Sequence, residues 1–158
     1  MSTELYLKHI TPEQLNQLHK YGLAVNLDNL YEQIAEDMES WLLLDEHILG
    51  FMRRQDLKPS VLYIAVMAGS TFADSAERED FPRFFSAEEV QNLAQALHRV
   101  SAKDLQTRFE AMREEVGGVS IDGTDEQAFA RLQDRFQAVA AHYKAAAQQG
   151  KAMLLLLF

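Results

Sequence analysis

The last nine residues, Gly150-Lys151-Ala152-Met153-Leu154-Leu155-Leu156-Leu157-Phe158, decide the fold class of this 158-residue chain. After Gly150 and Lys151 the run is wholly apolar and too short to be a typical helix. Strands that are apolar on both alternating faces are usually buried on both sides of a sheet. The sequence therefore predicts that residues 151–158 form a buried strand, because an apolar chain end must dock in the interior.

The other end of the chain predicts a second strand. Residues 4–10 mix alternating polarity with β-forming residues and are followed by Thr11-Pro12-Glu13-Gln14. Thr11 and Gln14 have the spacing of a capping box, and proline suits the first helical position because its missing N–H would be unpaired there. We expect a strand over residues 4–10 and a helix over 12–20.

Apolar periodicity predicts helices in most of the remaining chain. Apolar residues at spacings of three and four predict a helix over 29–41, whereas the structure of 42–54 stays undecided. The apolar run 61–68 fits a buried strand or a buried helix, and Pro59 before it and Gly69 after it favour the helix. Residues 70–85 are expected to form a loop.

Capping signals place the later helices. Ser86-Ala87-Glu88-Glu89 and Thr124-Asp125-Glu126-Gln127 are capping boxes, and Ser101 opens a further helix that ends at Gly117-Gly118. A short strand is expected over 119–121, and the helix that begins after Thr124 should end at Gly150. Together these segments predict an α+β fold: a single domain, residues 1–158, with several helices packed on a small sheet that includes both chain termini.

The composition supports a globular domain. Hydrophobic residues make up 47% of the chain, and there are no cysteines to form disulfides or thiolate metal sites. The first residues lack the basic and apolar regions of a secretory signal, and no apolar run approaches the roughly 18 residues that span a bilayer. We therefore expect a cytoplasmic protein.

The net charge of -9 is concentrated in one segment. It argues against nucleic acid and anionic membranes as partners, because both select clustered lysine and arginine. Residues 28–46 hold seven acids and no base. Such a run is a solvated helix face, a docking surface for a basic protein, or a divalent-cation site, although no D-x-D-x-D-G loop is present. The candidate partner-binding residues are Glu32, Glu36, Asp37, Glu39, Asp45 and Glu46.

No motif in the chain indicates a chemical activity. The five histidines, His9, His19, His47, His98 and His142, form no H-x-x-x-H or H-E-x-x-H pattern. Gly69-Ser70-Thr71 is neither a G-x-S-x-G elbow nor a phosphate loop. Aromatic residues in segment 69–85 (Phe72, Phe81, Phe84 and Phe85) leave open a ligand pocket there. We expect no catalytic residues, no cofactor and no metal.

Several residues of the second half of the chain occur in an order that resembles a known family. They are Phe84-Phe85-Ser86-Ala87-Glu88-Glu89-Val90, Leu93, Ala96-Leu97, Ser101, Leu105, Arg108-Phe109 and Met112, and also Tyr143-Lys144-Ala145-Ala146 and Gly150-Lys151-Ala152-Met153-Leu154. The family that they resemble is that of the bacterial YfbM-like domains of unknown function. The resemblance covers residues 61–158 and, more loosely, 5–18, and the chain departs from it over 22–58. It implies an α+β fold and no activity. Some members of the family lie near toxin genes, which implies a possible immunity role.

Two functions are therefore expected. The first is a non-catalytic interaction protein, of immunity type in its most concrete form, that presents the acidic segment to a basic, toxin-like partner. The alternative is a small hydrolase or small-molecule-binding domain that uses the 69–85 loop. The sequence leaves the oligomeric state open.

Overall fold

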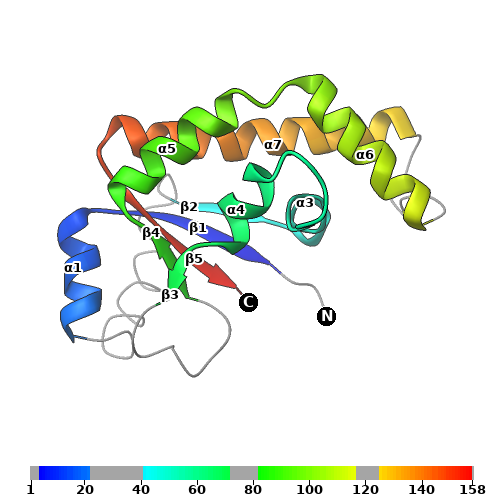
Figure 1. Cartoon of the computed structure of the whole chain (residues 1–158). Coiled ribbons are helices and arrows are strands. Elements are labelled where there is room, and N and C mark those ends of the chain that lie inside the picture. Colours follow the sequence, from blue (N-terminus) through cyan, green and yellow to red (C-terminus); the bar gives the residue numbers. More distant parts are fainter. Residues whose placement is uncertain (1–3, 22–40, 72–81, 117–124, 158) are drawn as a thin grey trace.

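The computed structural model describes residues 4–21, 41–71, 82–116 and 125–157, which form six helices and five strands (Figure 1). In chain order the elements are β1 (Leu5–Ile10), α1 (Pro12–Tyr21), β2 (Trp41–Leu44), α3 (Glu46–Met52), α4 (Val61–Met67), β3 (Ser70–Thr71), β4 (Arg83–Phe85), α5 (Ala87–His98), α6 (Ala102–Val116), α7 (Asp125–Gln148) and β5 (Ala152–Leu157). The predicted α+β fold class is confirmed.

All five strands join one antiparallel sheet in the order β2-β1-β5-β4-β3. The first and last strands are neighbours, and β5 lies at the centre of the sheet with Leu5 opposite Leu157 and Ile10 opposite Ala152. The prediction that the sheet includes both chain ends is therefore confirmed. A central position explains why the C-terminal run is apolar throughout, since it is covered on both faces.

The two faces of the sheet belong to two cores. Leu5 and Leu7 of β1 and Leu155 of β5 face the layer that contains α3 to α7, in the larger core. The alternate residues, among them Leu154 and Leu156, pack with Leu15 and Leu18 of α1 and with Trp41 in the smaller core. Figure 1 shows α5, α6 and α7 on one side of the sheet and α1 beyond its other side. Because side chains alternate between the two faces of a strand, alternate residues of β5 pack in different cores.

Local capping signals are confirmed where the structure describes them. Thr11 Oγ1 accepts from the Gln14 backbone N–H at 3.1 Å while Gln14 Oε1 accepts from Thr11 N–H at 2.9 Å, and Ser86 and Glu89 make the same exchange. At the end of α7, Gly150 has φ +66°, the left-handed conformation that a Schellman cap requires. Lys151 N–H donates to Ala146 O at 2.9 Å, which turns the chain from α7 directly into β5.

Some sequence predictions were wrong or incomplete. Trp41, assigned to the helix 29–41, instead begins β2, where it pairs with Lys8. The undecided segment 42–54 contains the rest of β2 and all of α3, whereas 61–67 is helical as favoured. Residues 70–85 are not simply a loop, because both ends are strands that pair with each other. Such two- and three-residue strands exist only through their partners, so periodicity does not reveal them.

Other predictions lie outside the described residues: the helix over 29–40, the strand over 119–121 and the cap at Thr124. Within the described ranges, no helix is long and apolar enough to cross a membrane.

Candidate functional site

Only the end of the acidic segment falls in the described structure. Glu32, Glu36, Asp37 and Glu39 lie outside the described residues, whereas Asp45 and Glu46 stand at the start of α3. Asp45 is the N-cap of α3, and its Oδ1 accepts from the backbone N–H groups of His47 at 3.1 Å and Ile48 at 3.2 Å. Glu46 is exposed in the first turn. One carboxylate oxygen of Asp45 is therefore already used to cap its own helix.

Asp45 also lies beside Arg135 of α7. Its Oδ2 lies 3.5 Å from Arg135 Nη2, and both carboxylate and guanidinium border a small pocket of about 160 Å³. This pocket, which we call the arginine pocket, is lined by Asp45, His47, Ile48, Ala128, Arg131, Leu132 and Arg135. The sequence placed Asp45 in an acidic surface, but the fold brings it next to Arg135, and Arg131 borders the same pocket.

The described ends of segment 69–85 pack closely, and none of their residues lines the arginine pocket. A Cβ added to Gly69 would lie 3.0 Å from the backbone oxygen of Phe84, so the two strands approach at a position that suits glycine. Phe85 is buried in the larger core, and Phe84 packs against the smaller one. Phe72 and Phe81 lie outside the described residues. The aromatic side chains that are described thus serve the packing of the sheet.

Two of the histidines form a buried stacked pair. His9 of β1 and His142 of α7 have ring centroids 3.9 Å apart, and each side chain is less than a tenth exposed. His9 Nε2 lies 2.9 Å from His142 O, and His142 Nε2 lies 2.9 Å from Leu7 O. A carbonyl oxygen only accepts, so both Nε2 atoms carry the proton. Burial first, and then the neighbouring His9, lowers the pKa of His142 from 6.5 to about 4, so the imidazole is neutral at pH 7.

The other histidines are separate from this pair. His19 contacts the Phe84 ring edge-on, His47 borders the arginine pocket, and His98 borders a groove between α5 and α7. The structure therefore assembles no group of three His, Asp or Glu side chains able to hold a metal ion within the residues it describes.

Two buried cations hold the framework. Arg108 of α6 is 1% exposed, and its guanidinium donates to the carbonyls of Phe51 at 2.8 Å, Met52 at 2.9 Å and Arg54 at 2.8 Å, and also to Leu57 O. Burial lowers its pKa to about 10, which leaves it charged at pH 7. Arg108 thus holds the end of α3 and the connection to α4 against α6.

Lys8 is the second buried basic residue. It is 3% exposed, and its Nζ lies 5.2 Å from the centre of the Trp41 ring.

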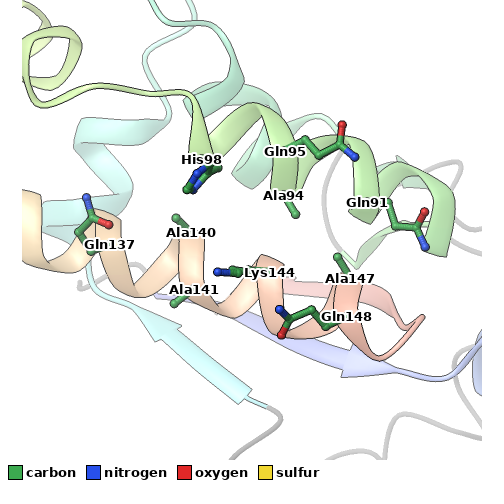
Figure 2. A pocket seen from close by; sticks show the side chains of 10 residues that line it. All are labelled: Gln91, Ala94, Gln95, His98, Gln137, Ala140, Ala141, Lys144, Ala147 and Gln148. Atoms are coloured by element: carbon green, nitrogen blue, oxygen red, sulfur yellow. The ribbon is translucent and has the colours of Figure 1, made fainter.

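The groove between α5 and α7 is larger, about 560 Å³, and runs along the outer surface of the helical layer (Figure 2). Four alanines and four glutamines line it together with His98 and Lys144, and none of the ten residues is acidic. Figure 2 shows Lys144 near the middle, His98 toward one end and Gln148 toward the other. The groove arises because alanines face each other where larger side chains would fill the space between the helices.

These two sites differ in the groups that they offer to a ligand. The groove presents amides, one imidazole and one amine, with no carboxylate. The arginine pocket presents two guanidiniums and one imidazole beside a carboxylate that already caps a helix.

Sequence reasoning missed the buried polar residues, although it contained a signal for them. Arg108 lies three residues after Leu105 on the apolar face of α6, and His142 lies three after Val139 on that of α7. A polar residue within an apolar helical stripe indicates burial with a partner. The sequence does not indicate which partner each residue meets.

Comparison with known proteins places the chain in a family. The crystal structure of YfbM from Escherichia coli, a protein of unknown function, is similar at a TM-score of 0.62 and 17% identity, over 98% of this chain and 99% of YfbM. At that identity the similarity shows the fold alone. None of the curated proteins matches the chain. The model of the family described as "Domain of unknown function (DUF1877)" matches residues 1–156. The resemblance to YfbM-like domains is confirmed, and the chain belongs to the DUF1877 family.

Proposed function

We propose that this protein is a non-catalytic interaction domain of immunity type that binds a basic, toxin-like protein through the acidic segment 28–46. The observation that carries the proposal is the run of seven acids without a base. A dense surface of one charge sign accelerates encounter with an oppositely charged partner and selects against like-charged competitors.

The described end of the segment supports a location at the margin of the sheet. Segment 28–46 runs into β2, which is the first strand in the sheet order and has β1 as its strand neighbour. Glu46 follows in an exposed position, and Leu43 of β2 is 41% exposed. The described part of the segment thus presents to solvent an acid, Glu46, and an apolar side chain, Leu43, three residues apart.

The structure also indicates which acid to leave out of a test. Asp45 caps α3 and lies next to Arg135, so replacing it with lysine would disturb the helix as well as the charge. Glu32, Glu36 and Glu39 are the better probes because they lie within the densest part of the segment.

The alternative function, a small hydrolase or small-molecule-binding domain that uses residues 69–85, has less support. Its described residues contribute to the sheet and the two cores, and they border neither the groove nor the arginine pocket.

The test compares three immobilised proteins as baits in lysate at low and at high salt, with captured proteins identified by mass spectrometry. The baits are wild type, the triple variant Glu32→Lys, Glu36→Lys and Glu39→Lys, and a control with lysine at three exposed helical acids: Glu13, Glu110 and Asp134. Both triples change the net charge equally, and circular dichroism checks that each is folded.

The proposal expects a basic protein that wild type and the control triple capture at low salt and that the segment triple loses. Recovery should fall as salt rises, because exposed charges are then screened. Capture of the same proteins by all three baits would refute the role of the segment.

A further inference from the structure

We propose that the arginine pocket binds the phosphate group of a small phosphorylated molecule. This site shares Asp45 with the acidic segment 28–46, but the proposal does not depend on the segment's docking role. Its argument rests on two arginines of α7 and a histidine of α3 that line one pocket with a rigid base.

The arginines of the pocket come from α7, and α3 adds a histidine. Arg131 and Arg135 are four residues apart in α7, so they lie on one face of the helix with Cβ atoms roughly 5–6 Å apart. His47, from the first turn of α3, borders the same pocket and adds an imidazole. Arginine guanidiniums present several N–H donors in a planar fork that matches phosphate oxygens.

The base of the pocket is part of the core. Ile48 is fully buried, and Leu132 and Ala128 are 5% and 3% exposed. The polar side chains therefore stand on two packed helices rather than on a loop, and an anion that binds need not order the backbone. Sites held on such elements keep their geometry more precisely than sites on loops.

The size of the pocket suits a single anionic group. Its volume is about 160 Å³. This is room for one tetrahedral oxyanion, with the remainder of the molecule outside. We infer a phosphate monoester rather than an extended polyphosphate or a peptide.

Asp45 currently supplies the negative charge at this place. Its contact with Arg135 is 3.5 Å long, and the two side chains are 37% and 57% exposed. Strong charge-assisted hydrogen bonds are shorter, about 2.7–2.9 Å, so this pair is loose and exposed to solvent. A phosphate has more charge and more acceptor oxygens than a carboxylate, and it can therefore draw Arg135 away while Asp45 continues to cap α3.

Because Asp45 competes with phosphate for Arg135, removing its charge should strengthen phosphate binding. Asparagine caps a helix about as well as aspartate does, so Asp45→Asn should preserve α3 while it removes the competing charge. The variant should bind phosphate several-fold more tightly than wild type. A misfolded protein would not show such a gain, so this outcome separates binding from damage.

The experiment titrates the full-length protein with inorganic phosphate and, separately, with glycerol phosphate, at constant ionic strength, and follows backbone and arginine Nε–H signals by NMR. Sodium acetate and sodium chloride are the comparison salts. Arg131→Gln and Arg135→Gln should each weaken binding about ten-fold, and Arg99→Gln, at an exposed position on α5's C-cap, should change it less than two-fold.

Saturable shifts at α3 and α7 with either phosphate probe support the site, and tighter binding of glycerol phosphate identifies the monoester as the better ligand. Phosphate binding no stronger than that of acetate or chloride would overturn the proposal. So would an unchanged affinity in the Arg131→Gln/Arg135→Gln double variant, or weaker binding by a folded Asp45→Asn variant.

Discussion

Acid should destabilise the protein through the buried pair of His9 and His142. The perturbation is a change from pH 7.5 to pH 5, at which an unfolded histidine gains a proton but His142 in the folded chain does not. Burial and the adjacent His9 lower the pKa of His142 from 6.5 to about 4. Because the unfolded state binds more protons, the stabilisation is complete above pH 6.5 and is lost as the pH falls toward 4.

The magnitude follows from these two pKa values. One unit corresponds to 1.36 kcal/mol, so the full effect, reached below pH 4, is about 3 kcal/mol. At pH 5 about 2 kcal/mol is already lost relative to pH 7.5. That is a large share of a typical unfolding free energy of about 5–15 kcal/mol.

The assay is urea unfolding at several pH values between 7.5 and 5, for wild type, His142→Gln and His98→Gln. Glutamine at 142 retains an N–H donor for Leu7 O but does not titrate. We expect wild type to lose about 2 kcal/mol more than His142→Gln over this range, while His98→Gln, altered at an exposed position of the groove, follows wild type. Parallel pH profiles for wild type and His142→Gln would refute the reasoning.

Three further predictions concern the framework. Arg108→Met should lower the unfolding free energy by at least about 3 kcal/mol, because the carbonyls of Phe51, Met52 and Arg54 lose a charged donor; urea unfolding measures it. Gly150→Ala should cost about 1 kcal/mol, since φ is +66° there and alanine disfavours left-handed backbone; thermal unfolding measures it. Deleting residues 153–158 should abolish cooperative folding, because it removes most of the central strand; circular dichroism on heating shows whether a transition remains.

Each of these has its own contradicting result. Lys103→Met changes an exposed position on the same helix. If Arg108→Met had the same unfolding free energy as Lys103→Met, the hydrogen bonds of the guanidinium would not stabilise the fold. A Gly150→Ala variant as stable as wild type would show that the turn into β5 does not require glycine. A sharp transition in the truncated chain would mean that β5 is dispensable.

Much of the fold could be predicted from the sequence because its signals are local. Capping boxes at Thr11 and Ser86 involve side chains that bond to backbone three residues away, and both are present in the structure. The errors have a common cause. Trp41 continues an apolar helical spacing, yet it lies in β2 because β1 offers it hydrogen-bond partners from across the sheet, and nothing within four residues of Trp41 encodes that pairing.

The candidate site was much less predictable. The structure describes two of the proposed partner-binding acids, Asp45 and Glu46. Asp45 lies near Arg135, which is 90 residues later in the chain, rather than in a uniformly acidic surface. Summing charge along the sequence treats neighbours in the chain as neighbours in space. On a folded surface the nearest charges often come from other elements, and here they come from α7.

The sequence by itself determined that this chain has a strand at each end, helices between them and an acidic segment at 28–46. These follow from periodicity, caps and composition, which act over a few residues. Only the tertiary structure decided that His9 stacks on His142, that Arg108 holds the end of α3, and that Arg135 lies beside Asp45. The partners in these contacts lie at least 50 residues apart in the chain, and burial brings them together because a polar group removed from water must find a partner wherever the fold places one.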